Sequence, residues 1–70
     1  MPQKIRELKQ QLTKIGFQKI PGKGSHTHWV HPLYAGKLTL SGKDGNDSKS
    51  YQEKAVNDAI EEVLRKKTED

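Results

Sequence analysis

Two amphipathic helix patterns near the ends of this chain restrict its fold more than any other feature. In the first, four apolar residues recur at steps of three, four and three: Ile5, Leu8, Leu12 and Ile15. This spacing puts them on one side of a helix, which we expect from about residue 3 to 15. Gly16 follows and is suited to end it, because glycine readily adopts the left-handed conformation of a C-terminal cap.

The second pattern occupies the last part of the chain. Ser50 and Glu53 have capping-box spacing, in which each side chain accepts a hydrogen bond from the other residue's backbone N–H. An apolar stripe at helical spacing follows: Tyr51, Ala55, Val56, Ala59, Ile60, Val63 and Leu64. We expect a helix from Ser50 to about Lys67, with frayed residues at Thr68–Asp70.

Between these patterns, short alternating segments separated by turn-forming residues predict three strands. We expect the strands at Phe17–Ile20, His26–His31 and Lys37–Leu40. Pro21-Gly22 ends the first, and Tyr34-Ala35-Gly36 is a natural turn before the third. The predicted fold is therefore α+β in the order α-β-β-β-α, a three-stranded antiparallel sheet with two helices packed on one face.

Composition limits the size and class of the protein. Seventy residues with 30% hydrophobic side chains support one thin core, so we expect a single domain over residues 1–70. The absence of cysteine rules out disulfides and thiolate metal sites. No apolar run reaches the roughly 18 residues of a membrane span, and no secretory signal follows Met1. We expect a cytoplasmic protein with no membrane partner.

The charge distribution is more informative than the total of +4. Residues 1–43 contain eight Lys and Arg against one acid, whereas residues 44–70 contain five against eight. This asymmetry favours an anionic partner for the first half of the chain, with nucleic acid the leading candidate. A lysine-rich surface kept for solubility is the alternative interpretation.

The segment from Lys23 to Pro32 carries the densest chemistry. It contains all three histidines and the only tryptophan of the chain. Histidine exchanges protons near neutral pH, and a lysine between two glycines can approach a phosphate closely. The residues alone leave open a proton-transfer site, a metal site and a histidine-rich strand.

Strand alternation divides these histidines between two faces. His26 and His28 share one face and His31 lies on the other. The three imidazoles therefore cannot converge, and a zinc site would need His26 and His28 plus a ligand such as Asp44 or Asp47.

Trp29 and His31 have structural interpretations that compete with functional ones. Trp29 is the natural large aromatic of a thin core, and its alternative role is a stacking platform for a base. We interpret His31 as a partly buried histidine that ends a strand and bonds to backbone.

The order of these motifs has a counterpart in a known family. A first helix is followed by Gly16-Phe17, Lys23-Gly24-Ser25-His26, then Trp29 and finally His31-Pro32. This order resembles the HicA (YcfA-like) toxins of bacterial toxin–antitoxin pairs, over roughly residues 4 to 64. The resemblance implies a double-stranded-RNA-binding-domain-like fold and a HicB-like antitoxin partner. The loop Ser41–Asp47 and the acidic last helix depart from many members, which have a basic loop and a basic last helix there.

The resemblance also implies an activity. Members are mRNA interferases, which cleave messenger RNA without a metal ion, and the histidine of the Gly-Ser-His motif is catalytic. His26 inherits that role, as a general acid or base acting on a ribose 2′-hydroxyl. We expect His28 as a possible second proton-transfer group, no cofactor, and five RNA- or phosphate-binding residues: Lys23, Gly24, Ser25, Lys19 and Lys37.

Two other functions fit the same residues. A non-catalytic RNA-binding module of the same fold would use the histidines only to contact phosphate. A small interaction domain whose real partner is an antitoxin-like protein is compatible with either function.

Overall fold

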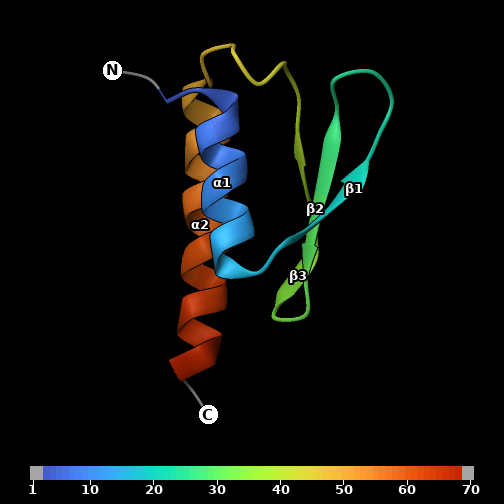
Figure 1. Cartoon of the computed structure of the whole chain (residues 1–70). Helices are drawn as coiled ribbons and strands as arrows, with labels where there is room; N and C mark the ends of the chain where they lie inside the picture. The colour runs from blue at the N-terminus through green and yellow to red at the C-terminus, as the bar shows by residue number, and fades with distance from the viewer. Residues whose placement is uncertain (1–2, 69–70) are drawn as a thin grey trace.

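The computed structural model of the chain describes residues 3–68. Its elements are α1 (Ile5–Ile15), β1 (Gln18–Pro21), β2 (Thr27–His31), β3 (Tyr34–Leu40) and α2 (Ser50–Thr68). The strands form one antiparallel sheet in the order β1-β2-β3. The two helices lie side by side, run in the same direction and cover one face of this sheet (Figure 1). The predicted α+β fold is confirmed.

The core lies between the helices and the covered face of the sheet. Its buried residues come from every layer: Leu8, Leu12, Phe17, Trp29, Leu38, Leu40, Val56, Ala59 and Val63. Phe17 belongs to this core but precedes β1, which begins one residue later than expected. The opposite face of the sheet carries His28, Val30, Lys37 and Thr39 and is not covered by a helix.

The apolar stripe predicted for α2 is partly wrong. Tyr51 and Leu64 remain 64% and 45% exposed, whereas Gln52 is buried. The inward positions of α2 follow steps of four, three and four residues from Gln52 through Val56 and Ala59 to Val63. Tyr51 and Leu64 therefore lie about 100° around the helix from this line. Gln52 is satisfied there because its Nε2 donates to Ser41 O at 2.9 Å.

The helix ends agree only in part with the sequence signals. Gly16 caps α1 as predicted, with φ +110° and its N–H directed to Leu12 O and Thr13 O. The Ser50–Glu53 capping box is wrong, because Glu53 Oε2 instead accepts from Ser48 Oγ at 2.6 Å. Lys49 takes the capping position, and its N–H donates to Gln52 Oε1 at 2.8 Å.

The C-terminal end of α2 extends further than expected. Thr68 is helical and its Oγ1 donates to Arg65 O at 2.8 Å, so fraying at this residue is wrong. The rest of the expected frayed segment, residues 69–70, lies outside the described residues. Neither α1 nor α2, over residues 3–68, is apolar enough along its length to cross a membrane.

The turn between β2 and β3 also differs from the prediction. Pro32 and Leu33 make the turn, and Tyr34-Ala35-Gly36 belongs to β3. Leu33 N donates to the His31 side chain at 3.0 Å and closes the turn early. The pairing then shifts between Trp29↔Leu38 and His31↔Tyr34, which forms a bulge. Gly36, with φ +80°, lies in this bulge.

Candidate active site

The turn between β1 and β2 carries four of the residues singled out in the sequence. It projects at the end of the sheet that lies away from the helices (Figure 1). His26 N donates to Lys23 O at 3.1 Å, and Gly22 N donates to His26 O at the same distance. Within the turn only Gly24 has a positive φ, +59°, which is the pattern of a type II′ turn. Lys23, Gly24, Ser25 and His26 are therefore displayed together on a hydrogen-bonded, exposed turn.

His26 lies in this turn rather than in β2, one residue before the strand begins. Its Nδ1 lies 3.2 Å from Lys23 O. A carbonyl oxygen can only accept, so this contact requires the proton on Nδ1 and leaves Nε2 with its lone pair in the neutral ring. The side chain is exposed. His26 is thus arranged to accept a proton at Nε2.

His28 packs beneath the turn on the uncovered face of the sheet. Its Nδ1 lies 2.9 Å from Thr39 Oγ1 of β3. A Cβ placed on Gly22 would lie only 3.1 Å from His28 Nε2 and 3.0 Å from His26 O. Gly22 is therefore required by close approach and not by its φ. The sequence indicated only a strand end at Gly22, and this contact becomes visible once β1 pairs with β2.

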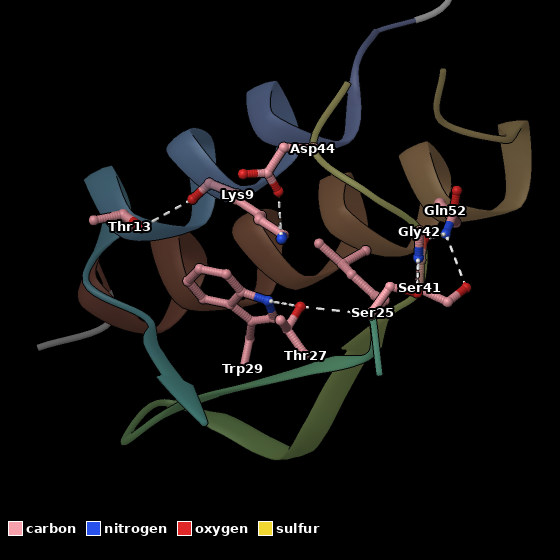
Figure 2. Close-up of polar contacts among 10 residues, drawn as sticks. Lys9, Thr13, Ser25, Thr27, Trp29, Ser41, Gly42, Asp44 and Gln52 are labelled. Carbon is pink, nitrogen blue, oxygen red and sulfur yellow. Dashed lines mark hydrogen bonds and ion pairs between the residues drawn. The ribbon is translucent and has the colours of Figure 1, made fainter. Parts of the chain in front are cut away.

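Ser25 and Gly24 have different surroundings within the turn. Gly42 N donates to Ser25 Oγ at 3.4 Å, a long bond that joins the turn to the loop before α2 (Figure 2). A Cβ on Gly24 would meet nothing within 4 Å. Ser25 thus helps to anchor the turn, whereas Gly24 is open to an approaching ligand.

Lys19 and Lys37 lie on opposite faces of the sheet. Lys19 in β1 pairs with Trp29 in β2, so both side chains lie on the helix-facing side of the sheet. Lys37 precedes the buried Leu38 in β3, so its side chain lies on the uncovered face of the sheet with His28. Along β3, Lys37 is two residues from Thr39, on the side of the bulge. The structure does not gather these two lysines with the turn into one cluster.

Trp29 and His31 have the structural roles that the sequence favoured. Trp29 is 3% exposed and its Nε1 donates to Thr27 Oγ1 at 3.0 Å, so it is not a stacking platform (Figure 2). His31 Nδ1 accepts from Leu33 N and therefore carries no proton. The His31 ring lies 5.1 Å, centroid to centroid, from that of Phe17.

The aspartates proposed as extra metal ligands have lysine partners instead. Asp44 Oδ1 lies 2.6 Å from Lys9 Nζ, and Asp47 Oδ1 lies 2.5 Å from Lys4 Nζ. The hydrogen bond from Lys9 lowers the pKa of Asp44 below its usual value. The positive charges of Lys9, Lys19 and Arg6 lower this pKa further, by smaller amounts. Residues 3–68 contain no group of three or more His, Cys, Asp or Glu placed to hold a metal ion.

Comparison with known families gives a match over most of the chain. A family model described as "HicA toxin of bacterial toxin-antitoxin" matches residues 5–65. The matched range runs from the first residue of α1 almost to the end of α2 and includes the whole β1–β2 turn. Comparisons with curated proteins and with solved structures gave no significant match.

Proposed function

The chain belongs to the HicA toxin family of toxin–antitoxin systems, and from this premise we propose that it is a metal-independent endoribonuclease acting on mRNA. The observation that carries the proposal is the exposed His26 imidazole, whose Nε2 is left available by the contact of Nδ1 with Lys23 O. A histidine in this state is suited to remove a proton from a substrate hydroxyl at cellular pH.

In the proposed reaction His26 Nε2 takes the proton of a ribose 2′-hydroxyl. The 2′-oxygen then attacks the neighbouring phosphorus, and the bond from phosphorus to the 5′-oxygen of the next nucleotide breaks. The products are a 2′,3′-cyclic phosphate and a 5′-hydroxyl, so one proton is removed and one is delivered. General acid–base catalysis of this kind contributes about 10²–10⁴-fold.

The leaving 5′-oxygen needs a proton donor. His28 is our candidate because it lies directly beneath the turn, with Nε2 facing Gly22. Its Nδ1 is already engaged by Thr39, so Nε2 is the atom that would deliver the proton. A water molecule would serve the same purpose if His28 only supports the turn.

The charge that develops on the phosphoryl oxygens needs stabilisation. Lys23 supplies a positive charge, and the Gly24 and Ser25 amides lie in the same exposed turn. We propose that these three residues hold the reacting phosphate. Lys37 on the uncovered face and Lys19 on the helix-facing side would contact different phosphates, since they lie on opposite faces of the sheet.

Membership of this family implies an antitoxin partner. We propose a HicB-like antitoxin whose acidic surface covers the basic first half of the chain. Opposite charges across such an interface would speed association and fix the orientation of the two proteins.

The test is cleavage of RNA by the purified protein. The wild type should cut RNA in the presence of EDTA, leave DNA of the same sequence intact and produce 2′,3′-cyclic ends. His26→Gln should lower the rate by about 10²-fold or more, whereas Lys54→Ala on the exposed surface of α2 should not. Intact RNA with folded wild-type protein, or equal cleavage by His26→Gln, would contradict the proposal. Salt-sensitive binding without cleavage would identify an RNA-binding module instead.

A further inference from the structure

A basic groove lies on the helix-facing side of β1, away from the face that carries His28. It is a hollow of about 860 Å³ between α1 and β1, with Trp29 among its lining residues. Four cationic side chains line it: Arg6, Lys9, Lys14 and Lys19. Its volume lies within the roughly 300–1,000 Å³ of pockets that hold small organic ligands, which is sufficient for a nucleotide.

The two acids in this groove already have partners. Glu7 Oε2 accepts from Lys4 N at 2.6 Å, and Asp44 is paired with Lys9. By contrast, Arg6, Lys14 and Lys19 form no ion pair within residues 3–68. The groove therefore keeps a surplus of positive charge that suits an anionic ligand.

Asp44 lies in this groove, with its Oδ1 2.6 Å from Lys9 Nζ. Lys9, Lys19 and Arg6 all act to lower the pKa of its carboxyl group. Its side chain is 62% exposed, whereas that of Lys9 is only 19% exposed and is held in the wall of the groove. An exposed carboxylate on a loop can be displaced at small energetic cost, because exposed ion pairs contribute little to stability.

A second hollow connects this groove to the proposed catalytic turn. It measures about 620 Å³ and is lined by Gly24, Ser25 and Lys43 as well as Lys9 and Asp44. Lys9 and Asp44, the ion pair drawn in Figure 2, line both hollows, so the two hollows meet at this pair. We refer to the two hollows together as the path from the α1–β1 groove to the turn.

We propose that this path binds the backbone of the RNA segment next to the cleaved bond, with a phosphate replacing the Asp44 carboxylate on Lys9. Lys19 would hold the same or the adjacent phosphate. The identity of the ligand as RNA rests on the proposed function, whereas its anionic character follows from the lining residues. Asp44 thus acts as an internal competitor that occupies the groove until RNA enters.

Binding can be measured without cleavage. The probe is a fluorescent single-stranded RNA of mixed sequence, about 12 nucleotides long, with every 2′-hydroxyl methylated. Lys9→Ala and Lys19→Ala should weaken binding several-fold, and each should reduce the slope of log affinity against log salt by about 0.7 per lost contact. Asp44→Asn should tighten binding. Lys54→Ala is the matched control, because Lys54 pairs with Asp58 on the exposed surface of α2.

The opposite effects expected for Lys9→Ala and Asp44→Asn separate this proposal from a structural role. If the ion pair only stabilised the loop, both variants would weaken binding and lower the melting temperature together. That result, or binding by Lys9→Ala and Lys19→Ala equal to that of Lys54→Ala, would refute the groove. Absence of probe binding by the wild type would also refute it.

Cleavage of unmodified RNA distinguishes the two proposals. If the wild type leaves RNA intact while the probe binds as expected, the nuclease proposal fails and the groove proposal is supported. If Lys9→Ala and Lys19→Ala cut RNA at the wild-type rate, the groove proposal fails and the nuclease proposal is supported.

Discussion

The ring of His28 lies so close to Gly22 that any β-carbon at residue 22 would be 3.1 Å from Nε2. The same β-carbon would be 3.0 Å from the backbone oxygen of His26, which cannot rotate away as a side chain can. Through Gly22, the strand under the turn and the turn itself are packed against each other. The position of the proposed catalytic imidazole therefore depends on the absence of a side chain at Gly22.

We predict that Gly22→Ala displaces the turn. The rate of RNA cleavage should fall by a larger factor than the equilibrium constant for folding. Overpacking of this kind costs about 1–3 kcal/mol when the neighbours must move. Gly45→Ala is the control, because a β-carbon there meets nothing within 4 Å and its φ is not positive. Thermal melting and cleavage rates measure the two effects. Equal values for both alanine variants would show that the turn tolerates a side chain at Gly22.

Gly24 presents the opposite constraint, because it has space around it but a φ of +59°. We predict that Gly24→Val loses about 1–2 kcal/mol of unfolding free energy and that Gly24→Asn loses less, because a β-branched side chain tolerates a positive φ least. Denaturant unfolding of the two variants measures the difference. A valine variant as stable as the asparagine variant would mean that the turn has another accessible conformation.

The sequence predicts those features that depend on neighbouring residues. The three-four-three apolar spacing predicts α1, and strand alternation correctly puts His28 and Trp29 on opposite faces. Partners outside the predicted motif explain the error at the start of α2. Glu53 accepts hydrogen bonds from Ser48, five residues earlier, and from Gln3, 50 residues earlier, instead of completing a capping box with Ser50.

The groove cannot be predicted from the sequence, because its residues are far apart along the chain. Lys9 and Asp44 are 35 residues apart, and no local pattern joins them. Gly22 likewise resembles any strand-ending glycine until the pairing of Ile20 with His28 brings β1 and β2 together. The Gly-Ser-His motif is recognisable in the sequence, whereas the contact that fixes the His26 tautomer depends on the turn conformation.

We predict that acid weakens the protein partly through Glu53. Hydrogen bonds from Ser48 and then from Gln3 lower its pKa below the ordinary value of 4.5. Because the pKa is lower in the folded state, the carboxylate stabilises the fold above its unfolded pKa, and this contribution is lost as pH falls through the folded value. Urea unfolding should show Glu53→Gln less stable than wild type at about pH 7, with the difference falling below the unfolded pKa and lost once the pH is below the folded pKa. A difference independent of pH would show that the charge on Glu53 is not responsible.

The hydrogen bond from Trp29 to Thr27 allows a test of the core. Thr27 and Trp29 are 9% and 3% exposed, so an indole N–H that loses its acceptor has little access to water. We predict that Thr27→Val, which keeps the shape of the side chain, costs about 1–3 kcal/mol by leaving a buried donor unsatisfied. In Trp29→Phe the donor is absent, so the same valine substitution should cost less. A double-mutant cycle by chemical denaturation measures this coupling directly. Equal costs of Thr27→Val in both backgrounds would show that the bond to Oγ1 of Thr27 does not stabilise the fold.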